Sequence, residues 1–285
     1  WVVHDIVETF ERHVEMPSRD VPTCPVSTVE ESPFHPIEAA QELRTSWGID
    51  KGPIAHLLRT AENHGIVVTF SPIQAASVDA YSFETPSRPI ILLNPLKNDY
   101  YRQRFDLAHE IGHIVMHVDV EPGGRIPEQQ ANQFASELLM PADEIIEQLP
   151  SRINWPHLLS LKEYWGVSLQ ALLFRARELE TLSDVTYRNA LIRMSKEGWR
   201  RQEPGRHRTL EQPSLLPQSL SLLETIGTLP ENIATEARVP MNLFTTITSR
   251  EPGINKSVHI DISPRTTSDR PMDEAEVISL FENYV

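Results

Sequence analysis

The sequence predicts an α+β fold in which a small antiparallel sheet precedes a long helical region. Short β-branched or apolar stretches at residues 66–70, 78–83 and 88–93 predict three strands. The Thr85-Pro86-Ser87 turn predicts that the last two strands form a hairpin. From about residue 100 to 180, apolar residues recur at helical spacing.

Helices are also expected before the sheet. Residues 1–15 predict a short amphipathic helix, and the five prolines of residues 16–36 predict an extended connector. A helix at about residues 37–47 follows. The next helix is expected at about residues 53–63, because Pro53 suits the first helical position.

The second half of the chain is expected to be helical with one break. A basic, proline-bearing stretch at residues 198–217 precedes a small helical unit at 216–249, for which packing or protein binding is favoured over DNA binding. A terminal helix is expected at 273–284. The order of these elements predicts four parts: an N-terminal helix and proline-rich connector (1–36), a core (37–150), a helical extension packed on the core (151–205) and a small helical, regulatory C-terminal region (206–285).

Composition excludes several classes of protein. The chain has 285 residues, one cysteine and a formal net charge of −14. A disulfide framework and a cysteine-rich zinc finger are therefore excluded, and binding of nucleic acid by the whole chain is disfavoured. No membrane span or signal peptide is visible, which predicts a cytoplasmic protein. The first residue, Trp1, predicts that the natural N-terminus is missing.

One segment carries a metal-binding pattern, His109-Glu110-Ile111-Gly112-His113. On a helix, residues four apart share a face and lie about 6 Å apart along the axis, so both imidazoles can meet one Zn²⁺. Glu110 is placed to reach a water at that metal. The alternative is a helix with two surface histidines and a solvated glutamate, but the pattern favours a catalytic site.

A catalytic zinc site needs a third protein ligand and an open position. His117 lies about 12 Å from His109 along a straight helix, which is too far for one ion. This distance indicates that His117 does not bind the metal itself. His117 is then a histidine at the helix end or one that contacts a metal ligand.

The next expected helix, at residues 127–141, offers a better third ligand. Glu128 lies near the apolar stripe of this helix, where a carboxylate is costly unless it is paired or metal-bound. Glu137 lies on the opposite face and is expected to be solvated. We therefore predict His109, His113 and Glu128 as metal ligands, although a first-turn glutamate is also favoured by the helix dipole.

These residues resemble the ImmA/IrrE family of bacterial zinc metallo-endopeptidases. The resemblance covers about residues 37–205 and rests on segments 90–94, 104–113, 128–132 and 134–141. It implies a zincin-like metallopeptidase core. It also implies a zinc cofactor, with Mn²⁺ as a substitute, held by His109, His113 and Glu128, and a catalytic role for Glu110.

The resemblance also implies a function and partners. The family is known for cleavage or control of helix-turn-helix repressors in stress response, mobile elements or toxin–antitoxin-like gene pairs. We therefore expect a regulatory endopeptidase that cleaves a helix-turn-helix repressor or antitoxin-like partner. The alternative is a transcriptional regulator or toxin–antitoxin component whose core is a sensor or scaffold with little turnover. DNA contact is expected only through a missing N-terminal domain, an oligomer is compatible with both functions, and no membrane contact is expected.

Two expectations concern substrate binding. The strand at residues 88–93 is a candidate edge that would hold an extended peptide by main-chain hydrogen bonds. A donor that stabilises the oxyanion is also expected. The sequence leaves this donor open among Tyr100, Tyr101, His117, His157 and Tyr164.

Overall fold

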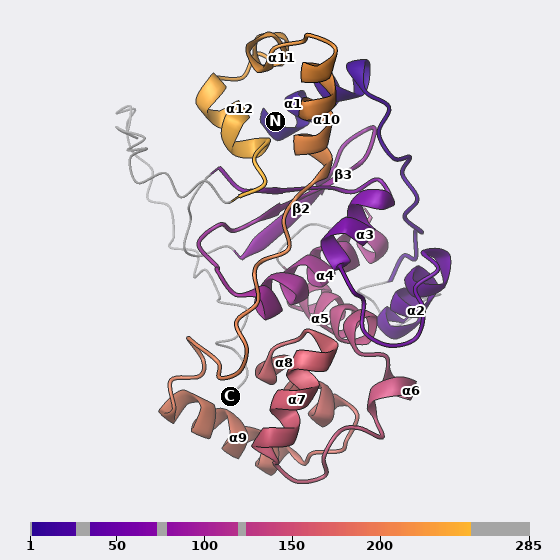
Figure 1. The fold of residues 1–285 in the computed structure, drawn as a ribbon. Coiled ribbons are helices and arrows are strands. Elements are labelled where there is room, and N and C mark those ends of the chain that lie inside the picture. Colours follow the sequence, from indigo (N-terminus) through magenta and orange to yellow (C-terminus); the bar gives the residue numbers. More distant parts are fainter. Residues whose placement is uncertain (1, 27–34, 73–78, 119–123, 252–285) are drawn as a thin grey trace, which may run out of the picture.

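The computed structural model describes residues 2–26, 35–72, 79–118 and 124–251. In this part of the chain a small sheet lies between two groups of helices (Figure 1). None of these helices has the length and apolar character needed to cross a membrane. The strands are β1 (Val67–Phe70), β2 (Ala80–Glu84) and β3 (Pro89–Leu93). The helices are α1 (Val2–His13), α2 (Pro36–Ser46), α3 (Leu57–Asn63), α4 (Tyr100–Met116), α5 (Arg125–Leu139), α6 (Ala142–Ile145), α7 (Trp155–Trp165), α8 (Leu169–Glu178), α9 (Asp184–Lys196), α10 (Leu215–Thr225), α11 (Pro230–Glu236) and α12 (Met241–Ile247).

The strands form one mixed sheet in the order β1-β3-β2. β2 and β3 pair antiparallel, with Ala80 opposite Leu93, as the hairpin prediction requires. β1 runs parallel to β3, with Val67 opposite Ile90, so the expected all-antiparallel pairing is wrong for this strand. The continuous apolar β3 is buried along its whole length and therefore takes the centre of the sheet. The prediction of an α+β fold with a small sheet is confirmed.

The two faces of the sheet enter two separate cores, because successive side chains of a strand point to opposite sides. Val68, Phe70 and Ile91 pack with α2–α5 and α7–α9. Val67, Ile90 and Leu92 pack with α1 and α10–α12. In Figure 1 the second group lies above the sheet and α3–α5 lie below it.

The two ends of the described chain meet on one face of the sheet. α1 contacts α10 and α11, and α10 and α12 contact β1. Phe10 stacks on Phe244 with ring centroids 6.1 Å apart. The small helical unit expected at residues 216–249 is confirmed as three short helices. The division at residues 36, 150 and 205 stays a prediction, and the helix expected at 273–284 lies outside the described residues.

Helix α3 begins at Leu57 rather than at Pro53, so the proline-based start is wrong. His56 caps the helix, and its Nδ1 accepts a hydrogen bond from the backbone N–H of Arg59 at 3.2 Å. The residues before His56 contact helix α4 instead of forming a helical turn. The carbonyl of Ile54 accepts a hydrogen bond at 2.7 Å from the guanidinium of the buried Arg104.

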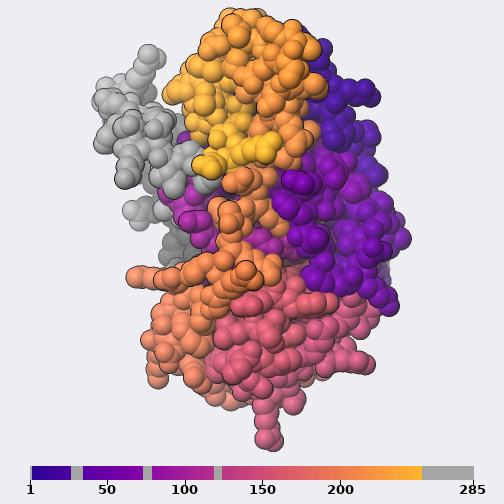
Figure 2. Space-filling view, in the orientation of Figure 1, coloured from indigo at the N-terminus to yellow at the C-terminus, as the bar shows by residue number. Residues whose placement is uncertain are grey.

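An irregular segment, residues 203–214, joins the lower helices to the upper group; we call it the crossing segment (Figures 1 and 2, orange). Glu203 accepts hydrogen bonds from Lys162 Nζ at 2.6 Å and from the backbone N–H of Leu169 at 2.8 Å. Glu211 pairs with the guanidinium of Arg104, which is 1% exposed. The crossing segment therefore supplies charges that the interior of the protein requires.

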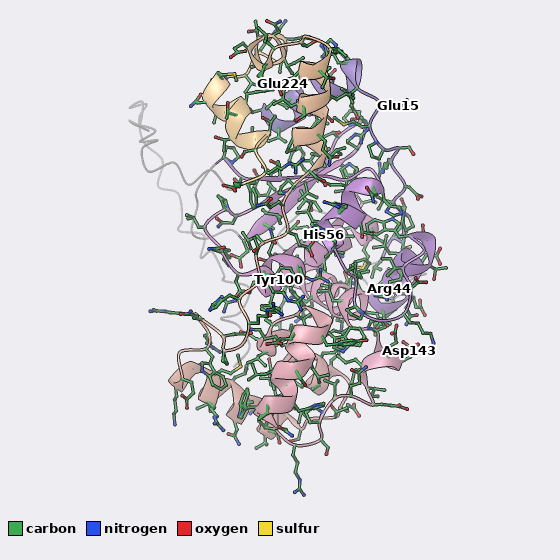
Figure 3. The ribbon with its side chains drawn as sticks, viewed as in Figure 1. Glu15, Arg44, His56, Tyr100, Asp143 and Glu224 are labelled. Atoms are coloured by element: carbon green, nitrogen blue, oxygen red, sulfur yellow. The ribbon has the colours of Figure 1, made fainter. Side chains whose placement is uncertain are left out.

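The crossing segment is also bound to α3. The backbone N–H of Leu58 donates to Glu211 at 2.6 Å, and His56 Nδ1 lies 3.3 Å from the same carboxylate. At the end of the segment, Ser214 donates its backbone N–H to Glu62 at 2.9 Å. Figure 3 labels His56 and Tyr100, which lie near this path.

Candidate metal centre

Helix α4 presents the histidine pattern on the side that faces α5. Asp99 caps the start of the helix and accepts hydrogen bonds from the backbone N–H groups of Tyr101 (2.9 Å) and Arg102 (3.1 Å). Leu107 and Ile111 enter the main core and fix the rotation of the helix.

Helices α4 and α5 approach closely at Gly112. A Cβ atom at this position would lie 2.9 Å from Cδ1 of Phe134, closer than carbon atoms can pack without displacement. Ala131 and Ala135 are both buried on the same helix as Phe134. Small residues on both helices therefore allow a carboxylate on α5 to reach the imidazoles of α4.

Three side chains meet between the two helices. His109 Nε2 lies 3.0 Å from His113 Nε2 and 3.1 Å from Glu128 Oε2. His113 Nε2 lies 3.5 Å from Glu128 Oε1. These ligand atoms all lie within 4.8 Å of one another. The structure thus brings together all three residues that the sequence analysis proposed as ligands.

Hydrogen bonds orient both imidazoles. His109 Nδ1 lies 3.0 Å from Asn132 Oδ1, and because this oxygen only accepts, Nδ1 carries the proton and Nε2 keeps a lone pair. His117 Nε2 lies 2.9 Å from Gln130 Oε1, so it is likewise the donor. His117 Nδ1 must then accept from His113 Nδ1, 2.9 Å away, which leaves a lone pair on His113 Nε2.

A cation fits the centre of this cluster. Two lone pairs and a carboxylate converge there, an arrangement that repels unless a positive charge lies among them. Burial alone would lower the pKa of His109, but the hydrogen bond to Glu128 and the charges of Glu110 and Glu128 outweigh burial and raise it. In their protonated forms His109 and then His113 donate to the carboxylate of Glu128 and hold its pKa well below its usual range. Two imidazoles and one carboxylate form a donor set that suits a catalytic divalent metal.

Glu110 lies beside the cluster and is held separately. Ser82 Oγ of β2 donates a hydrogen bond to Glu110 Oε2 at 2.6 Å, and the Glu110 side chain is buried. Sequence reasoning missed Ser82. The alternating pattern of residues 78–83 indicated a strand, but no local signal placed that strand against the histidine helix.

The strand beside the centre is β2. β3 is paired on both sides, so the expectation that residues 88–93 offer an open edge is wrong. In the described sheet β2 has a strand on one side only, and it contacts α4. Its outer edge carries main-chain groups that can pair with another strand.

The five side chains considered for the oxyanion have different surroundings. His117 hydrogen-bonds to a predicted ligand, as described above. Tyr101 and His157 hydrogen-bond to main-chain carbonyl groups elsewhere in the fold. Tyr100 packs against a guanidinium of the same helix, and Tyr164 is exposed on α7. The structure therefore brings His117 to the centre.

Glu137 is buried, so the expectation of a solvated residue is wrong. Its side chain is 0% exposed and pairs with Arg175 of α8, and Gln41 of α2 donates to it at 3.0 Å. The side of α5 that carries Glu137 is thus also buried, because it packs against α2 and α8. Removing Glu137 would break a fully buried ion pair and leave Arg175 with Glu178 as its remaining carboxylate, which makes Glu137 unsuitable as a control for the metal centre.

Glu128→Ala is expected to weaken zinc binding by more than about 100-fold, because even a residue that only supports a ligand contributes about 10–100-fold to metal affinity. The measurement is competition with a chromogenic chelator, with the folded state checked by circular dichroism. Glu147→Ala is the control, since this carboxylate is exposed on the surface. Equal zinc loss in both variants, or in neither, would contradict the ligand assignment.

The comparison with known families agrees with this geometry. Residues 61–177 match the family Peptidase_M78, described as the IrrE N-terminal-like domain. The matched range contains β2, α4 and α5, and therefore the whole cluster together with Ser82 and Glu110. Among curated proteins, none matches the chain. The match supports a relationship of residues 61–177 to the ImmA/IrrE family of metallopeptidases.

Proposed function

We propose that the protein is a zinc-dependent endopeptidase of regulatory type, which hydrolyses a peptide bond in a helix-turn-helix repressor or antitoxin-like partner. The observation that carries this proposal is the convergence of His109, His113 and Glu128 beside a separately held Glu110. The family match over residues 61–177 supports metallopeptidase chemistry in general.

The two histidines and Glu128 would hold the ion through both Nε2 atoms and the carboxylate. Zinc in such a donor set supplies Lewis acidity, which lowers the pKa of a water molecule and polarises a carbonyl group. Asn132 and His117 keep the imidazoles in the tautomers that direct Nε2 to the metal. These two residues support the ligands without replacing them.

Glu110 is the residue that moves a proton. Because Ser82 donates to Oε2, we assign the proton-accepting role to Oε1. Glu110 Oε1 takes a proton from the attacking water and then delivers it to the leaving nitrogen, which departs as an amine. Ser82 keeps the carboxylate turned towards the edge of β2.

The edge of β2 is suited to hold the substrate. An extended peptide that pairs with this edge by main-chain hydrogen bonds lies beside Ser82, and therefore beside Glu110. A compact protein presents such a segment only at a loop or at a locally unfolded end. We therefore expect slow, selective cleavage of one helix-rich partner and little activity on unfolded substrates such as casein.

The test is incubation of the zinc-loaded protein with the purified helix-turn-helix regulator encoded beside its gene. Mass spectrometry should find one cleavage site, cleavage should stop when a chelator removes the metal, and added zinc should restore it. An intact partner under all metal conditions, including added Mn²⁺, would contradict proteolysis. That result would favour the alternative, a regulator or toxin–antitoxin component whose core is a sensor or scaffold.

A further inference from the structure

A cavity of about 170 Å³ includes Asn132 in its wall. Asn132 Oδ1 accepts the hydrogen bond from Nδ1 of the predicted metal ligand His109. The Asn132 side chain therefore connects the wall of the cavity with the imidazole of His109. No residue of this cavity has a role in the chemistry proposed above, apart from Asn132.

The interior of the cavity is largely apolar. Phe105 of α4, Ala171 and Phe174 of α8 and Leu191 of α9 line it. These residues come from three helices of the main core, which packs around the cavity and holds its shape. A cavity of this size and lining suits one large apolar side chain.

The charged groups in the wall are largely engaged with protein partners. Lys97 pairs with Asp79, and the Arg102 guanidinium donates to the main-chain carbonyl of Arg200. Burial raises the pKa of Asp106 to about 6. A charged ligand would lose its water among groups that are already paired, so the wall does not favour one.

The cavity lies near the start of β2, the strand whose edge is suited to hold the substrate, and a short distance from Ser82. Asp79, in the cavity wall, directly precedes β2, and Ser82 lies three residues further along. Because a strand rises about 3.3 Å per residue, the two positions are about 10 Å apart. A peptide paired with β2 and cleaved beside Glu110 would therefore bring a residue within three positions of the scissile bond to the cavity.

A second hollow shares Asn132 and Phe174 with the cavity and is also lined by Gln129 and Gln133 of α5 and by Ser183. The two hollows are therefore neighbours in the region of α5 and α8. Neighbouring hollows can hold successive parts of a polypeptide.

We propose that the cavity binds a large apolar side chain of the substrate, of the size of leucine, methionine or phenylalanine, within three residues of the scissile bond. This inference rests on the proposed function and adds to it the sequence preference of the cleavage site. Burial of such a side chain strengthens binding by about 10- to 100-fold.

The experiment uses hydroxamates, which bind zinc directly, as probes of the zinc-loaded protein. Acetohydroxamate reports the metal alone. The second set of probes consists of di-alanine peptides that carry a hydroxamate at either end. In related peptides one alanine is replaced by leucine, arginine or aspartate. Their affinities measure how well each side chain binds in the cavity. Calorimetry should show that leucine at one position binds at least about tenfold more tightly than alanine there, and that arginine and aspartate gain nothing comparable.

Two cavity variants and one control connect this preference to the cavity. Ala171→Phe and Gln170→Trp each place a large side chain in the cavity. Ala171 lies in the core, whereas Gln170 is partly exposed. Each variant should reduce the preference for leucine over alanine to less than about threefold. Ile192→Trp lies on α9 beside Leu191 but is 53% exposed, and it should keep the full preference. Zinc content and circular dichroism establish that each variant is folded.

The outcomes separate the two proposals. Acetohydroxamate binding without any leucine preference, or with a preference that a folded Gln170→Trp variant retains, would overturn the cavity assignment and leave the metal centre intact. Failure of acetohydroxamate to bind the zinc-loaded protein would overturn the metal centre and the cavity proposal together.

Discussion

Glu110→Gln should lower the rate of partner cleavage by about 10²- to 10⁴-fold while zinc remains bound. General acid–base catalysis contributes rate factors of this size, and an amide cannot take the proton that the carboxylate takes. The change preserves shape, and the amide oxygen can still accept the hydrogen bond from Ser82. The measurement combines single-turnover cleavage of the partner with metal analysis of the same preparation.

The control for this variant is Ser82→Ala, which removes the hydrogen bond but keeps the carboxylate. It should lose much less activity than Glu110→Gln and retain its zinc. If Glu110→Gln loses zinc, the variant reports the fold rather than the chemistry. Undiminished cleavage by a zinc-loaded Glu110→Gln protein would falsify the role assigned to Glu110.

A chain that ends at Gln202 should fail to fold. Sequence patterns alone predict a zinc-loaded core from such a truncation, because residues 206–285 lie outside the metal-binding motifs. The structure reverses this expectation. The truncation removes Glu211, the counter-charge of the buried Arg104, and breaking a buried pair costs about 3–5 kcal/mol. That loss is a large part of a typical stability of about 5–15 kcal/mol.

The same truncation exposes one face of the sheet. Val67, Ile90 and Leu92 would lose their contacts with α10–α12, and α1 alone cannot cover them. Soluble yield, circular dichroism and zinc content measure the outcome. A chain that ends at Glu251 is the control, because it keeps every contact described here, and Glu211→Gln separates the loss of the charge from the loss of the helices. A folded, zinc-loaded chain ending at Gln202 would contradict the expectation.

The convergence of His109, His113 and Glu128 was predictable because its signals are local. The spacing of His109 and His113 places them on one face of a helix, and Glu128 occupies the first turn of the next helix near an apolar stripe. The strands and the hairpin were predictable for the same reason. Each signal lies within a window of about fifteen residues, where helical and strand periodicities can be recognised.

Glu137 shows why the rest was not predictable. A helical periodicity gives the direction of a side chain but not the number of neighbours around the helix. α5 is covered by α4 on one side and bonded to α2 and α8 on another, so its polar side is also an interior. Likewise, Arg104 and Glu211 are 107 residues apart, and Ser82 and Glu110 are 28 apart. No local pattern indicates such pairs.

Because the crossing segment lies late in the chain, the side chains of the donor set are synthesised before the contacts that stabilise their helix. The three predicted ligands and Glu110 are all made by residue 128, long before the ribosome adds Glu211 and Ser214. Until then Arg104, in the same helix as the two histidines, lacks the carboxylate of Glu211, and one face of the sheet lacks the cover of α10–α12. A prematurely terminated chain therefore carries a complete donor set without a stable scaffold. The donor set is therefore complete in the growing chain before the contacts that hold its scaffold can form.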